Sequence, residues 1–142
     1  MNYLEIQIDR LITYINNNDL GFGWKNHPER TFRGEFKNGE PFDYTIFTKK
    51  GRIVFDAKET DKDKWVILPK DKKQGLNLFK CQKVGVEAFF LIYFITSKKL
   101  MKLDIKKFFD TMATRKYIMQ LDCIEFNLEE LIENGITSKN KK

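Results

Sequence analysis

The sequence has few of the residues that bind zinc or form disulfides. It contains one histidine, His27, and two cysteines, Cys81 and Cys123, which show no metal-ligand spacing. A zinc site is therefore not expected. The two cysteines are expected to be free thiols in a reducing cytosol.

Long hydrophobic runs are also absent. The longest apolar run, Ala88 to Ile95, has eight residues, whereas a helix needs about 20 apolar residues to span a bilayer. We therefore expect no membrane span, no membrane partner and no signal peptide. The expected location is the cytoplasm.

The length of the chain indicates the number of domains, and its charge indicates the kind of partner. A chain of 142 residues is long enough for one core, and we expect a single domain over residues 1–137 followed by a basic, flexible tail over 138–142. The net charge of +6 and the pI of about 9.2 favour a polyanionic partner such as nucleic acid. Mildly basic soluble domains are common, so the charge alone does not decide the partner.

Hydrophobic periodicity predicts an α/β fold, with a mixed central sheet flanked by helices. The segment 87–96 is apolar on both faces, which is typical of a central strand covered by helices. Segments 17–23 and 61–64 have the composition of loops, and 31–37 could add an edge strand. The predicted helices are 3–16, one beginning at Lys70 or Asp71, 105–116 and 128–134, and the predicted strands are 41–48, 52–58, 87–96, 100–103 and 123–126.

The segment from Phe42 to Thr60 carries the most informative pattern. A turn at Lys49-Lys50-Gly51 would join two strands into a hairpin and place Asp43 nearly opposite Asp56. Because side chains alternate along a strand, Asp56 and Lys58 would share one face. Two adjacent carboxylates repel each other unless a cation or a proton lies between them. Their hard oxygen ligands suit Mg²⁺, with Mn²⁺ as a substitute. The alternative is a pair of solvated carboxylates at strand ends.

The pattern Asp43-x12-Asp56-x-Lys58 resembles the active-site motif of the PD-(D/E)xK nuclease superfamily. More specifically, FDYTIFTKKGRIVFDAKET, then Lys73-Gln74, then VGVEAFFLIYF is similar to the RecU family of Holliday junction resolvases. The similarity extends from about Asp43 to Phe94, roughly a third of the chain. It implies a restriction-endonuclease-like core over residues 1–137.

Three features depart from the family pattern. Lys73 stands where the family has a histidine before the glutamine, and Ile46 stands where it has a glycine. The stretch 17–41 is too short for the stalk that the family inserts into the junction. We therefore expect a compact member, such as a phage-encoded one, acting in the bacterial or host cytoplasm.

The resemblance implies a metal-dependent hydrolysis of DNA phosphodiesters. Asp43, Asp56 and the backbone carbonyl of Ala57 would hold Mg²⁺, and the 3′ oxygen would be the leaving group. Lys58 would assist at the nucleophile and stabilise the developing charge, and Gln74 would position water or phosphate. Lys58 could also be an ordinary ion-pair partner of Asp56, and Gln74 an exposed helix residue.

Residues outside the motif could complete the acidic cluster or support the structure around it. Glu5 on the first helix would complete the acidic cluster by resemblance, with Asp9 as its rival one turn later; either could be a plain exposed carboxylate. Glu59 points away from Lys58, so a structural or helix-capping role is expected. Thr60 could form a hydrogen bond in the loop that follows.

Basic residues flank the motif in sequence and suit phosphate contacts that position DNA, although any single lysine is more often simply solvated. Phe22, Trp24 and Trp65 could stack on bases at a branch point, but such residues are more often core or dimer contacts. The predicted DNA-binding residues are Arg30, Arg33, Lys49, Lys50, Arg52, Lys72 and Lys73.

Resolving a four-way junction takes two symmetric nicks, so a C2 homodimer is expected, without a small-molecule cofactor. Helix 3–16 or the Phe-rich helix 105–116 could supply its interface. Two other interpretations remain. One is a branched-DNA or restriction-like nuclease of the same fold, and the other is a non-catalytic protein that binds DNA structures and modulates recombination.

Overall fold

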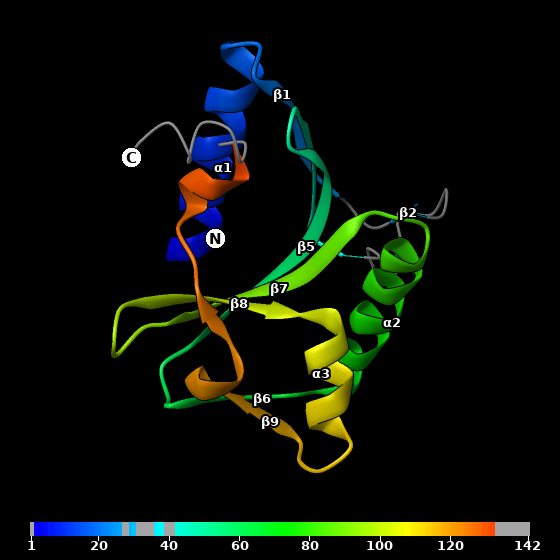
Figure 1. The fold of residues 1–142 in the computed structure, drawn as a ribbon, viewed down its shortest axis with the longest axis vertical. Helices are drawn as coiled ribbons and strands as arrows, with labels where there is room; N and C mark the ends of the chain where they lie inside the picture. The colour runs from blue at the N-terminus through cyan, green and yellow to red at the C-terminus, as the bar shows by residue number, and fades with distance from the viewer. Residues whose placement is uncertain (1, 27–28, 31–35, 39–41, 133–142) are drawn as a thin grey trace.

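The computed structural model describes residues 2–26, 29–30, 36–38 and 42–132, and only the backbone of 29–30 and 36–38. A six-stranded mixed sheet with the order β1-β4-β5-β7-β8-β10 forms its centre (Figure 1). β5 and β7 are parallel, and the other neighbouring pairs of this sheet are antiparallel. The strands are β1 (Gly21–Lys25), β4 (Tyr44–Thr48), β5 (Gly51–Thr60), β7 (Glu87–Phe94), β8 (Lys99–Asp104) and β10 (Ile124–Glu125).

Helices cover both faces of this sheet, as Figure 1 shows. α1 (Tyr3–Asn17) buries Leu4, Ile8, Ile12 and Ile15 against one face. α2 (Pro69–Lys83) and α3 (Ile105–Met112) pack on the other face over a second apolar cluster. The predicted mixed sheet flanked by helices is therefore confirmed. Among the described residues, no helix is long and apolar enough to cross a membrane.

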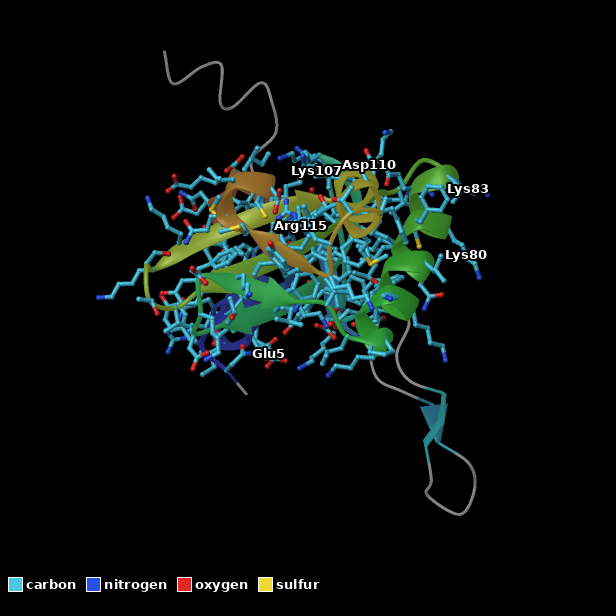
Figure 2. The ribbon with its side chains drawn as sticks, turned by 90° about the horizontal axis from the view of Figure 1, so that it is seen from below. Glu5, Lys80, Lys83, Lys107, Asp110 and Arg115 are labelled. Atoms are coloured by element: carbon cyan, nitrogen blue, oxygen red, sulfur yellow. The ribbon has the colours of Figure 1, made fainter. Side chains whose placement is uncertain are left out.

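Two small sheets accompany the central one. β6 (Lys64–Val66) pairs with β9 (Tyr117–Met119), and β2 (Glu29–Arg30) pairs with β3 (Phe36–Asn38). β2 and β3 stand away from the body of the molecule in Figure 2. The remaining described elements are the 3-10 turns η1 (Gln120–Asp122) and η2 (Leu128–Leu131).

Several predicted boundaries were wrong. Segment 17–23 is not all loop, because β1 begins at Gly21, and Trp65 lies in β6 where a loop was expected. The third helix ends at Met112 because the chain then turns into β9. In each case cross-strand pairing outweighs the local composition. Residues 31–35 of the possible edge strand and the predicted tail 138–142 lie outside the described residues.

Two glycines help to position the β4–β5 hairpin and α2. Gly51, at the turn between β4 and β5, has a φ of +138°, which a residue with a side chain rarely adopts. A Cβ on Gly75 would lie 2.6 Å from the Phe108 ring, so glycine lets α2 approach α3 closely. This close packing fixes α2 over the sheet face that carries Asp56 and Lys58.

Candidate active site

The β4–β5 hairpin places Asp43 and Asp56 side by side. Tyr44 is paired with Phe55, so the two aspartates occupy the next opposed positions at the open end of the hairpin. The Asp43 N–H donates to Asp56 Oδ1 at 2.9 Å, and the Ala57 N–H donates to Asp43 Oδ2 at 3.0 Å. The opposition predicted from the position of the turn is confirmed.

Alternation along β5 separates two sets of side chains. Val54 packs in the cluster under α2 and α3, whereas Ile53 and Phe55 pack under α1. Asp56 and Lys58 share the face of Val54 and therefore meet α2. Glu59 faces α1, where its Oε2 accepts the Leu4 N–H at 2.6 Å, which confirms the predicted capping role.

Lys58 is held by three acceptors. Its Nζ lies 2.8 Å from Asp56 Oδ2 and 2.8 Å from Asp71 Oδ1, and it donates to Gln74 Oε1 at 2.8 Å. The ammonium also lies 5.9 Å from the centre of the Trp65 ring. The structure therefore brings Gln74 to the site, and the alternative of an exposed helix glutamine is wrong.

Asp71 is a residue of this site that sequence reasoning missed. It lies in the first turn of α2, is buried, and its Oδ2 accepts the Leu68 N–H at 2.8 Å. In the sequence it stands among Lys70, Lys72 and Lys73, so the run looks like a solvated basic flank. An acidic residue in the first turn is a normal helix-start signal, and that signal could have singled it out.

Burial changes the protonation of the central pair. Removal from water raises the pKa of Asp56 to about 7, although Lys58 lowers it and Asp43 raises it further. Burial lowers the pKa of Lys58, but the charges and hydrogen bonds of Asp56 and Asp71 outweigh burial and raise it overall. Lys58 is therefore a cation, and a second positive charge beside Asp56 would favour its ionised form.

Glu5 lies in a second polar group, on the α1 side of the sheet. Its Oε2 accepts from Lys25 Nζ at 2.9 Å, and its Oε1 accepts the Asn2 N–H at 3.2 Å in a capping box. Burial raises the pKa of Glu5, but the hydrogen bonds from Lys25 and Asn2 outweigh it and lower the pKa overall. Both carboxylate oxygens of Glu5 are thus engaged.

Lys25 is the cation of this second group. Burial lowers the pKa of Lys25, but its hydrogen bond to Glu5 and the charges of Glu5, Asp43 and Asp9 raise it overall. Asp9, the rival of Glu5, accepts from the Tyr44 hydroxyl at 3.4 Å. Lys25 was not predicted, because the strand that carries it was read as a loop.

The predicted DNA-binding residues do not gather in one place. Lys72 and Lys73 are exposed on α2 beside Asp71 and Gln74. Lys49, Lys50 and Arg52 lie at the turn end of the hairpin, and Lys50 donates to the backbone oxygen of Glu130 at 2.7 Å. Arg52 is four residues from Asp56, roughly 13 Å along a strand that rises about 3.3 Å per residue. Arg33 and the side chain of Arg30 lie outside the described part.

The predicted base-stacking aromatics differ in exposure. Trp65 is buried against Phe90 and Phe108, so the alternative interpretation, that Trp65 is a core residue, is correct. Phe22 is exposed on the edge strand β1, where Trp24 contacts its ring and that of Phe47. Thr60 accepts the Lys62 N–H and donates to the Lys64 carbonyl, so it orders the turn after β5.

The oxygen atoms at the open end of the hairpin supply some, but not all, of the ligands that a hard divalent cation needs. Asp56 is fully buried with a raised pKa, and Asp43 lies directly beside it. Since the N–H and C=O of one strand residue point to the same side, the Ala57 carbonyl faces Asp43 as its N–H does. No three His, Cys, Asp or Glu side chains of the described residues come together as a metal site, so a cation here would need backbone, water or substrate oxygens.

A solved structure shares the fold of this chain. Hjc from Archaeoglobus fulgidus, a Holliday junction resolvase from an archaeal hyperthermophile, matches with a TM-score of 0.54 and 11% identity, over 88% of this chain and 99% of Hjc. At this identity the likeness concerns the fold, and it supports the restriction-endonuclease-like architecture. No curated protein matches the sequence.

A match between the sequence and a protein-family model identifies the family. The model of the RecU family, described as Recombination protein U, matches residues 4–141, nearly the whole chain. The chain belongs to the RecU family. The resemblance seen between Asp43 and Phe94 is confirmed and extended to both ends, and with it the expectation of a resolvase-type nuclease of DNA recombination.

Proposed function

We propose that this chain is a metal-dependent endodeoxyribonuclease that resolves Holliday junctions by paired symmetric nicks. The observation that supports this most is the buried group at the open end of the hairpin. There Asp43 and Asp56 are joined by a hydrogen bond, and Lys58 lies 2.8 Å from Asp56. A protein that only bound junctions would not need a buried aspartate with a second aspartate and a lysine beside it.

Asp43, Asp56 and the Ala57 carbonyl are the proposed ligands of Mg²⁺, with Mn²⁺ as a substitute. When bound, the cation would neutralise charge on the scissile phosphate and lower the pKa of a water molecule. Asp56 is suited to this role because its burial makes an isolated negative charge costly. Glu5 is proposed as an additional ligand, and this role would compete with its ion pair to Lys25.

Lys58 and Gln74 are the proposed catalytic side chains beside the ligands. Lys58 carries a positive charge next to the carboxylate pair, where it can donate to the attacking water or to the phosphoryl oxygens. Gln74 accepts from Lys58 at 2.8 Å, so it fixes the direction of the ammonium, and its amide N–H groups remain donors for phosphate.

The proposed DNA contacts fall into two groups. Lys72 and Lys73 on α2 lie near enough to Gln74 to hold the phosphates beside the scissile bond. Lys49, Lys50 and Arg52 at the turn end would hold a more distant part of the duplex arm. Arg30 and Arg33 complete the proposed set on sequence grounds alone.

Paired nicks require two sites, so the proposal includes a C2 homodimer of one nuclease domain each over residues 1–137. A DNA substrate places the enzyme in the bacterial cytoplasm, or in that of the host if the chain is phage-encoded. No small-molecule cofactor is included.

The test is cleavage of a synthetic mobile four-way junction in Mg²⁺ or Mn²⁺, with linear duplex as the control substrate. We expect paired symmetric nicks on the junction alone, lost in Asp56→Asn. Equal cutting of linear duplex would replace the resolvase by a less selective nuclease of the same fold. Tight junction binding without cleavage in either metal would instead identify a recombination modulator.

A further inference from the structure

Asp71 is a buried carboxylate that the proposed chemistry does not use. Its side chain is 2% exposed, and its two oxygens have separate partners. Oδ2 accepts the Leu68 N–H, whereas Oδ1 lies 2.8 Å from Lys58 Nζ. Burying a carboxylate is costly unless a partner compensates it, and capping α2 occupies only one of these oxygens.

Three acceptors crowd the Lys58 ammonium. Nζ donates a hydrogen bond to Gln74 Oε1 and forms ion pairs with Asp56 Oδ2 and Asp71 Oδ1, each at 2.8 Å. Water or phosphate would therefore compete with these three acceptors for Lys58.

Of the three acceptors, only Asp56 is also a proposed metal ligand. A cation held by Asp56 would share this carboxylate with Lys58 and so weaken their ion pair. Gln74 is neutral and could not by itself balance the buried ammonium. Asp71 would then be the carboxylate that still compensates its charge.

We propose, as an inference that rests on the proposed function, that Asp71 is a positioning residue for Lys58. It holds the ammonium in place through Oδ1 while Asp56 serves the cation, so that the ammonium stays directed at the substrate. Asp71 itself touches neither substrate nor metal.

The competing explanation is that Asp71 only caps its helix. α3 offers a matched control, because Asp104 caps it with Oδ2, which accepts the Lys106 N–H at 3.0 Å. Asp104 is exposed, and Lys58 is not among its contacts. Asparagine keeps one acceptor oxygen at either position, so Asp71→Asn and Asp104→Asn both preserve a cap while removing a charge.

The first arm of the test measures junction cleavage and thermal unfolding of both variants. Since a displacement of about 1 Å in a catalytic group can cost roughly 10²-fold, we expect Asp71→Asn to lower kcat by about 10- to 10²-fold. KM and junction affinity should stay unchanged, and Asp104→Asn should keep the wild-type kcat. Wild-type turnover by Asp71→Asn, or a loss of kcat by Asp104→Asn that matches it, would overturn the proposal.

The second arm needs neither metal nor cleavage. Reductive methylation of the metal-free protein, read by mass spectrometry, reports how firmly Lys58 is held. We expect faster methylation of Lys58 in Asp71→Asn, unchanged methylation in Asp104→Asn, and restored protection in Asp71→Asn/Gln74→Glu, which returns a carboxylate to Lys58. Unchanged labelling in Asp71→Asn would overturn the proposal. A wild-type chain that cuts no junction would overturn the proposed function instead, while the labelling still decides the contact.

Discussion

Two ion-pair groups lie on opposite faces of the central sheet and differ in burial. On the α2 face, the side chains of Lys58, Asp56 and Asp71 are 13%, 0% and 2% exposed. On the α1 face, those of Lys25 and Glu5 are 31% and 22% exposed. Asp43 interacts with both groups. Its N–H donates to Asp56 in the first group, and its charge raises the pKa of Lys25 in the second.

Burial decides what each group can do. Charges that are removed from water interact strongly and shift one another's pKa values, whereas partly exposed pairs are screened and contribute little to stability. The α2-face group therefore carries the larger desolvation cost, whereas the Glu5–Lys25 pair has the exposure of an ordinary surface ion pair. Substitutions on the two faces should differ accordingly.

The largest effect is expected from Asp56→Asn. Asparagine can still accept the Asp43 N–H but lacks the charge that holds a divalent cation, so junction cleavage should fall to background. Cleavage assays with the wild type in parallel measure this. Retention of cleavage near the wild-type rate would remove Asp56 from the proposed ligands.

Lys58→Met should come next, with cleavage reduced by about 10²- to 10⁴-fold, as expected for a group that assists proton transfer or charge stabilisation. It also leaves Asp56 and Asp71 without their cation, and breaking a buried pair costs roughly 3–5 kcal/mol. Single-turnover cleavage and denaturant unfolding measure the two losses. Unchanged stability would show that the pair is less buried than the structure indicates.

Glu5→Gln tests whether the α1 face contributes to the metal site. If Glu5 joins the ligands, loss of its charge should weaken Mg²⁺ binding by about 10-fold, in the range seen for outer contributors to metal sites. Titration calorimetry with Mg²⁺ measures this. Unchanged affinity would confine the site to the hairpin and leave Glu5 as the cap and the partner of Lys25.

The raised pKa of Asp56 predicts a pH dependence of stability without metal. The ordinary value is 3.8 and the folded value is about 7, so the folded protein binds this proton more tightly than the unfolded chain. The stability of the metal-free wild type, relative to Asp56→Asn, should therefore fall as pH rises from about 4 to about 7 and then level off. Thermal unfolding of both proteins from pH 5 to 8 measures the difference, and a rise with pH would contradict the assignment.

Mg²⁺ should then stabilise the wild type at pH 8 more than Asp56→Asn, because binding to the folded state alone raises the free energy of unfolding. An equal effect on both proteins would indicate that the cation binds elsewhere.

The smallest effect is expected from Lys25→Met. Exposed ion pairs contribute about 0–1 kcal/mol, so the free energy of unfolding should change by no more than about 1 kcal/mol and cleavage should persist. Denaturant unfolding beside Lys58→Met gives the direct contrast. A loss of stability equal to that of Lys58→Met would mean that the two faces do not differ.

The sequence was sufficient to predict the register of the hairpin, because the turn at Gly51 fixes which residues oppose one another. It also placed the side chains of Lys58 and Glu59 on opposite faces of the sheet, since alternation along a strand is strict. Gln74 could be placed only through the family resemblance. Nothing local in the sequence says that a residue on α2 will reach β5.

Asp71 and Lys25 were missed for different physical reasons. Asp71 stands in a lysine-rich run, and it is buried where α2 meets Lys58 of β5, a tertiary contact that periodicity does not reveal. Lys25 lies on β1, whose glycines suggested a loop, and pairing with β4 makes the strand. Lys49, Lys50 and Arg52 flank the motif along the chain but lie at the turn end of the hairpin, away from the carboxylates, and their contact with DNA stays a prediction.

The most direct test of the carboxylate pair is to locate the cation. Crystals of the protein grown with Mn²⁺, with data collected at the manganese absorption edge, would show its position by anomalous scattering. We expect a manganese peak beside the carboxylates of Asp43 and Asp56 and the Ala57 carbonyl, and we expect no such peak in Asp56→Asn. A peak between Glu5 and Asp9, or none at the hairpin under conditions that support cleavage, would contradict this expectation.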